Sequence, residues 1–75
     1  MRSPGELGRD VNGTPIVVGT RVEQTGTDAQ QGALRSRQGQ QGQVLRRSAT
    51  HMVVRFEGDT TLTRIRAHLL QVVDQ

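Results

Sequence analysis

The stretch that decides the fold is the alternating run His51-Met52-Val53-Val54-Arg55-Phe56-Glu57. Successive side chains of a β-strand point to opposite faces of a sheet, so Met52, Val54 and Phe56 share one face of this run. Phe56 is the single aromatic residue of the chain. We therefore expect a half-buried strand whose Phe56 face forms the centre of the core.

Neighbouring runs extend this strand into a predicted β-meander over residues 42–47, 51–57 and 61–66, with a short final strand at residues 69–73. Residues 47–50 are polar and of hairpin length, and Gly58 can take a positive φ without steric cost. A single 3₁₀ turn is expected over residues 66–70. Upstream, residues 16–24 predict the first strand, with Ile16, Val18 and Val22 on one face and a bend at Gly19.

Two segments lack this alternation. Residues 1–12 predict a flexible N-terminal tail ahead of a domain at residues 13–75. The Asn12-Gly13 pair predicts a turn, which could alternatively join a short strand at residues 9–11 to the first strand. Residues 25–41 predict a long loop that is either pinned to the sheet by Leu34 or left as an arm that orders on a partner.

Length and composition limit the class of protein. A chain of 75 residues is one domain near the lower size limit for an unassisted core. It contains no cysteine, which excludes disulfides and thiolate metal sites and suits a reducing cytoplasm. Its longest apolar runs are too short to cross a bilayer, and residues 1–9 hold no apolar signal core. We therefore expect a soluble cytoplasmic domain without membrane contact.

Several short motifs resemble those of the SH3-like small β-barrels. Val18-Gly19-Thr20-Arg21-Val22 resembles their opening strand, residues 53–59 resemble their third strand and its turn, and residues 68–73 resemble their closing segment. Gly39-Gln40-Gln41-Gly42-Gln43-Val44 is similar to the "Gly-x-x-Gly-x-Val" run of KOW-type modules, which bind RNA or polymerase. The resemblance covers residues 16–73. It implies an all-β, five-stranded SH3-like barrel with a long loop after the first strand and one 3₁₀ turn before the last.

The charge pattern suggests a binding surface. All ten basic residues are arginine, and residues 29–56 contain five of them and no acidic residue. A planar guanidinium suits phosphate or carboxylate, although a solvated face in an arginine-rich sequence is the alternative. The candidate contacts with a nucleic acid or an acidic partner are Arg35, Arg37, Arg46, Arg47 and Arg55. Because Arg46 and Arg47 are adjacent in a strand, only one of them can share a face with Arg55.

Catalysis is not expected. His51 and His68 have no third histidine or cysteine to complete a metal site, and the carboxylates form no recognisable acid–base pair. One phenylalanine without tyrosine or tryptophan cannot build a proline-peptide groove or a cation cage. We therefore expect a binding module without cofactor, metal or small-molecule substrate. A nucleic acid is the favoured partner, a regulatory or adaptor role on an acidic protein is the alternative, and the chain is expected to be a monomer or weak homodimer.

Overall fold

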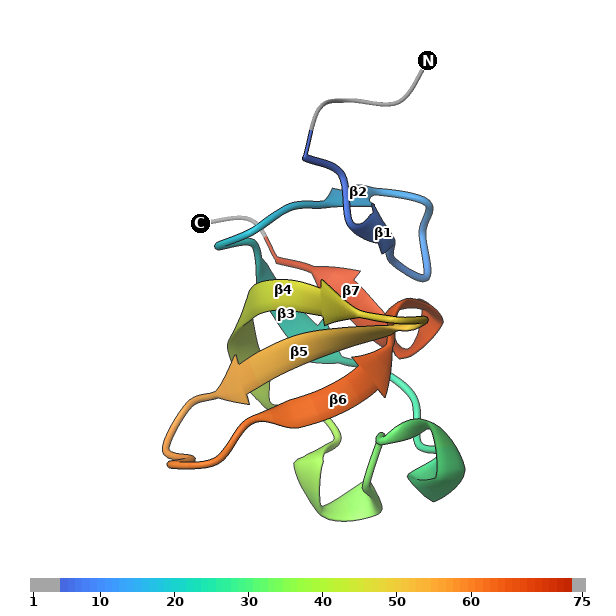
Figure 1. Ribbon diagram of the computed structural model, residues 1–75. Helices are drawn as coiled ribbons and strands as arrows, with labels where there is room; N and C mark the ends of the chain where they lie inside the picture. The colour runs from blue at the N-terminus through green and yellow to red at the C-terminus, as the bar shows by residue number, and fades with distance from the viewer. Residues whose placement is uncertain (1–4, 74–75) are drawn as a thin grey trace.

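The computed structural model describes residues 5–73, and this part of the chain is all-β (Figure 1). The strands are β1 (Gly8–Arg9), β2 (Pro15–Ile16), β3 (Arg21–Gln24), β4 (Gln41–Ser48), β5 (His51–Phe56), β6 (Thr63–Arg66) and β7 (Leu70–Val72). Three 3₁₀ turns connect them, η1 (Ala29–Gln31), η2 (Arg35–Arg37) and η3 (Ala67–Leu69). The predicted meander, the 3₁₀ turn before the last strand and that last strand are confirmed.

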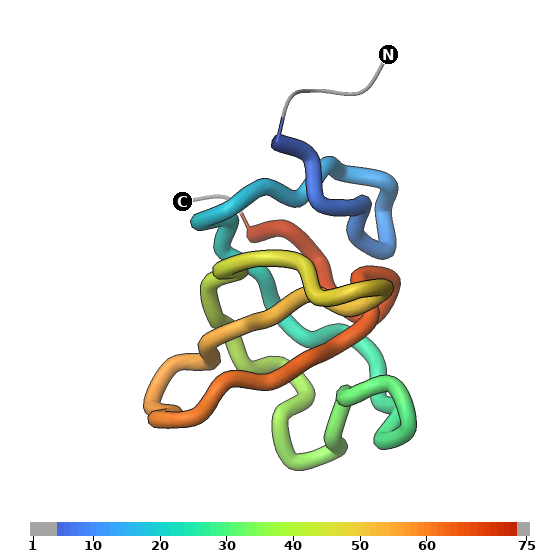
Figure 2. The backbone as a smooth tube through the Cα atoms, viewed as in Figure 1, coloured from blue at the N-terminus to red at the C-terminus, as the bar shows by residue number. Residues whose placement is uncertain are grey.

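Five strands form one antiparallel sheet in the order β6-β5-β4-β3-β7. The meander supplies β4, β5 and β6. Strand β3 pairs with β4 on one side and with the last strand, β7, on the other. Strands β1 and β2 form a separate two-stranded hairpin. Figure 2 shows this hairpin and the loop of residues 25–41 at opposite ends of the molecule.

The core lies on the face of β5 predicted from the sequence. Met52, Val54 and Phe56 are at most 2% exposed, and Ile65 on β6 and Val44 on β4 complete the centre of the same cluster. Val54 lies directly opposite Val44, and Met52 opposite Ile65. Because directly paired residues share a face, the alternation of three strands builds one apolar layer.

The first strand differs from its prediction. Residues 16–24 are not one strand, because the chain turns between β2 and β3. Gly19 takes a φ of 90°, the Thr20 N–H donates to the Val17 carbonyl, and the Thr20 hydroxyl accepts from the Val17 N–H. The expected bend at Gly19 is confirmed, but it leaves Val18 65% exposed instead of in the core.

The described part of the predicted tail packs against the domain. Strand β1 pairs with β2, with Gly8 opposite Ile16, so the prediction of a tail up to residue 12 is wrong for this segment. The alternative, in which the Asn12-Gly13 turn joins two strands, is the one found, with the upstream strand at Gly8–Arg9. Residues 1–4 of the predicted tail lie outside the described residues. Two features hold this segment: Ile16 is buried in the core cluster, and Asp10, which is 6% exposed, accepts hydrogen bonds from three backbone N–H groups.

The loop of residues 25–41 is folded onto the sheet. The amide of the buried Gln24 side chain donates to the carbonyls of Gly26 and Leu34, at 3.0 and 2.7 Å. Ala33 is fully buried, whereas Leu34 is 42% exposed. The prediction that Leu34 pins the loop is therefore wrong, because the small Ala33 side chain occupies the position against the core.

Candidate functional site: an arginine-lined sheet face

The candidate site is the face of β4, β5 and β6 that points away from the core. The strand register places Arg46 opposite Val53, and Val53 opposite Arg64. Two strand spacings separate Arg46 from Arg64, a Cα distance of about 10 Å. Arg55 lies two residues after Val53 on β5, and Arg66 lies two residues after Arg64 on β6. We call Arg46, Arg55, Arg64 and Arg66 the basic face.

Val53 shows how closely these arginines are held. It is 1% exposed although it points away from the core and is absent from the core cluster. Its direct neighbours on the outer side are Arg46 and Arg64. Arginine stems cover apolar surface while their guanidinium groups stay in water. Val53 is therefore a buried position on the outer side that is flanked by an arginine on each neighbouring strand, as expected if the arginine stems cover it.

A β-bulge decides which of the two adjacent arginines joins this face. The β4–β5 register shifts between Val44 and Arg46, which leaves Leu45 as the extra residue. Arg46 consequently lies opposite Val53 on the outer side, and Arg47 lies opposite Met52 on the core side. Arg47 is at the strand end, where it lines a hollow with Glu6 and Gly8 of the N-terminal segment. As predicted, only one of the pair shares a face with Arg55.

The remaining two predicted arginines lie on η2, away from these strands in sequence. Arg35 is exposed. Arg37 forms an ion pair with Asp59, and its guanidinium carbon lies 5.5 Å from the centroid of the Phe56 ring. The ion pair neutralises the Arg37 charge, and the cation–π contact adds an attraction to the Phe56 ring. Arg37 is therefore engaged within the fold, whereas the predicted Arg46 and Arg55 are brought together.

Arg64 and Arg66 lie outside the predicted set, because β6 follows the acid-free segment of residues 29–56 that defined it. The signal was present in the alternation of Thr63-Arg64-Ile65-Arg66, where a buried Ile65 places both arginines outside. Among the described residues, the ion pairs are Arg9–Glu6, Arg21–Glu57 and Arg37–Asp59. None of these involves the basic face.

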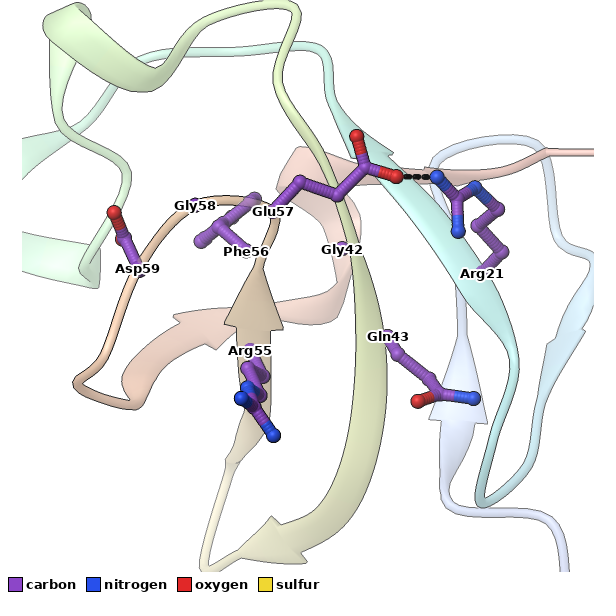
Figure 3. Close-up of a pocket in the computed structure, with 8 residues that line it drawn as sticks. All are labelled: Arg21, Gly42, Gln43, Arg55, Phe56, Glu57, Gly58 and Asp59. Atoms are coloured by element: carbon purple, nitrogen blue, oxygen red, sulfur yellow. Dashed lines mark ion pairs between the residues drawn. The ribbon is translucent and has the colours of Figure 1, made fainter.

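One end of the outer face has mixed charge (Figure 3). A hollow of about 420 Å³ lies there, which we call the Gly42 hollow; its lining residues are Arg21, Gly42, Gln43, Arg55, Phe56, Glu57, Gly58 and Asp59. Glu57 reaches across β4 to form its ion pair with Arg21. Two carboxylates and two guanidinium groups therefore share this hollow, and it does not favour an anion.

Two kinds of feature are absent from residues 5–73. No group of three or more histidine, cysteine, aspartate or glutamate side chains in that range is placed to hold a metal ion. No helix within it is long and apolar enough to cross a membrane.

Fold and face together define an all-β domain with a five-stranded antiparallel sheet and one arginine-lined outer side. Compared with known proteins, the chain matches no family model, no curated protein and no solved structure.

Proposed function

We propose that this chain is a non-catalytic binding module that contacts the phosphates of a nucleic acid through the basic face. The observation that carries the proposal is the row Arg46–Val53–Arg64, in which an arginine on β4 and an arginine on β6 lie on either side of the buried Val53 of β5. Arginine forms charge-assisted, often bidentate hydrogen bonds with phosphate. The proposal keeps Arg46 and Arg55 from the sequence-based set and adds Arg64 and Arg66.

The mode of binding is contact with the backbone of the nucleic acid. The single aromatic ring, Phe56, is 1% exposed and unavailable for stacking on bases. Proteins that bind single strands commonly add aromatic stacking to a basic groove. We therefore propose sequence-tolerant binding whose affinity comes from phosphate contacts.

We also propose that the sheet is the SH3-like small barrel that the sequence resembles. The position of β7 beside β3 and the 3₁₀ turn directly before β7 support this class. The pairing within residues 5–73 leaves β6 and β7 as the two ends of the strand order.

The alternative partner is an acidic protein whose carboxylates would bind the same arginines of this chain. The structure gives little support to a partner that binds by adding a strand to an edge of the sheet. Val11 donates a backbone hydrogen bond to Leu70 on the outer side of β7, and Gly32 lies against the Arg64 carbonyl of β6. Both end strands are thus partly covered, which is a common protection against edge pairing.

Salt dependence tests the proposed function. Binding of the full chain to a labelled mixed-sequence oligonucleotide is measured by fluorescence anisotropy over a range of salt concentrations. Four phosphate contacts predict a slope of about −3 to −4 in log K against log salt. Absence of binding even at low salt would contradict the nucleic-acid proposal, and an acidic protein partner would then be sought.

A further inference from the structure

A second hollow of about 420 Å³ lies at the other end of the outer face, between the β4–β5 turn and η1. We call it the hairpin hollow. Its polar side chains from the sheet are Ser48, His51 and Arg64, and Gly32 of the loop also lines it. Ser48 and His51 are directly paired, and Arg64 on β6 lies opposite Val53, two residues along β5 from His51. Three polar side chains from three adjacent strands thus line the same hollow.

The charge of this hollow distinguishes it from the Gly42 hollow. Its described lining contains an arginine and a histidine and no acidic residue, whereas Glu57 and Asp59 line the other. Arg64 is also a member of the basic face. The electrostatic environment of an anion is therefore more favourable at the Arg64 end of the basic face than at the Arg55 end, and the recess lies at the Arg64 end.

The walls of the hairpin hollow are held in place by the fold. Gly32, with a φ of 90°, packs so closely on β6 that a Cβ there would overlap the Arg64 carbonyl oxygen. The Thr50 hydroxyl lies 3.1 Å from His51 Nδ1, which leaves Nε2 as the ring nitrogen for a ligand. A site whose donors are fixed before binding loses less entropy when the ligand arrives.

From these features we infer that the hairpin hollow holds one phosphate of a single-stranded nucleic acid. Arg64 and the Ser48 hydroxyl donate to the phosphate oxygens, and His51 Nε2 faces the same group. An unpaired strand can bend a phosphate into a recess, whereas the phosphates of a duplex are fixed on a wide, stiff cylinder and reach only the basic face. The inference rests on the proposed function and adds to it a preference for single strands.

The test compares two serine variants that leave the net charge unchanged. Ser48→Ala removes a donor from the hollow, and Ser36→Ala removes an exposed hydroxyl from η2 as the matched control. Each protein is titrated by fluorescence anisotropy into a labelled single strand of about 12 nucleotides and into the corresponding duplex. Arg64→Gln is measured in parallel, and circular dichroism melting establishes that each variant is folded.

We expect Ser48→Ala to weaken single-strand binding about tenfold, the lower end of the loss typical of one hydrogen bond to a charged group. Arg64→Gln weakens it roughly tenfold or more. Ser48→Ala leaves duplex binding unchanged, and Ser36→Ala changes neither. If the chain binds with a steep salt dependence but Ser48→Ala behaves as Ser36→Ala, the hairpin hollow is not a phosphate site and the proposed function stands. If the wild-type protein binds neither probe at low salt, both the phosphate site and the proposed nucleic-acid binding are overturned.

Discussion

The carboxylate of Asp10 accepts a hydrogen bond from the backbone N–H of Val72, 62 residues further along the chain, at 2.7 Å. Its other oxygen accepts from the N–H groups of Asn12 and Thr14, which shapes the β1–β2 turn. One buried side chain therefore organises the N-terminal hairpin and attaches it to the outer edge of β7. Asp10 thus adds to the attachment that the buried Ile16 side chain and the Val11–Leu70 backbone hydrogen bond also provide.

Replacement of Asp10 by Asn tests this attachment. The amide has one acceptor oxygen where the carboxylate has two, so a buried N–H is left without its partner. We expect the free energy of unfolding to fall by about 1–3 kcal/mol. Urea denaturation followed by circular dichroism measures the change. Asn12→Ala, which keeps the backbone donor to Asp10, serves as the control, and equal stability of the two variants would show that the Asp10 contacts are dispensable.

Gly32 is predicted to be the least replaceable of the loop glycines. Gly32→Ala meets both the strain of a positive φ and an overlap with the Arg64 carbonyl. Gly39 has a similar φ of 84° but open space around the added Cβ, so Gly39→Ala isolates the backbone strain. We expect about 1–2 kcal/mol of destabilisation for Gly39→Ala. The overlap adds roughly 1–3 kcal/mol for Gly32→Ala. Thermal melting of the pair compares them, and identical melting temperatures would contradict the close contact with β6.

Phe56 is the largest side chain of the core. Phe56→Ala is expected to lower the free energy of unfolding by about 3–5 kcal/mol, which is a large part of the stability of a small domain. Leu62→Ala is the control, because Leu62 is 51% exposed and its truncation should change stability by no more than about 0.5 kcal/mol. Chemical denaturation measures both. A Phe56→Ala protein that unfolds cooperatively at the parent midpoint would place the core elsewhere.

The parts of the fold that follow from local alternation were predictable. The face of Met52, Val54 and Phe56, the meander and the last strand all follow from side chains that alternate along one strand. The break between β2 and β3 was harder to foresee, because it depends on Thr20 bonding to Val17 around Gly19. The role of Asp10 depends on a partner 62 residues away, which no local pattern reveals.

The candidate site was predictable to a similar extent. The sequence indicates that Arg46 and Arg47 point to opposite sides, but the bulge at Leu45 decides that Arg46 is the outer one. A strict alternation from the buried Val44 would have placed Arg47 there instead. In the sequence, Arg35 and Arg37 are equivalent basic residues of the same acid-free segment. Only the folded loop shows that Arg37 forms an ion pair with Asp59 and lies over the Phe56 ring.

The most direct test of the account is the comparison of Arg46→Gln with Arg47→Gln. The two variants remove the same charge from adjacent positions on opposite sides of β4. Affinity for a single-stranded oligonucleotide is measured by fluorescence anisotropy at several salt concentrations. We predict that Arg46→Gln weakens binding roughly tenfold and reduces the salt slope by about 1, while Arg47→Gln stays within about twofold of wild type. Equal losses in the two variants, or a larger loss in Arg47→Gln, would contradict the basic face as the binding surface.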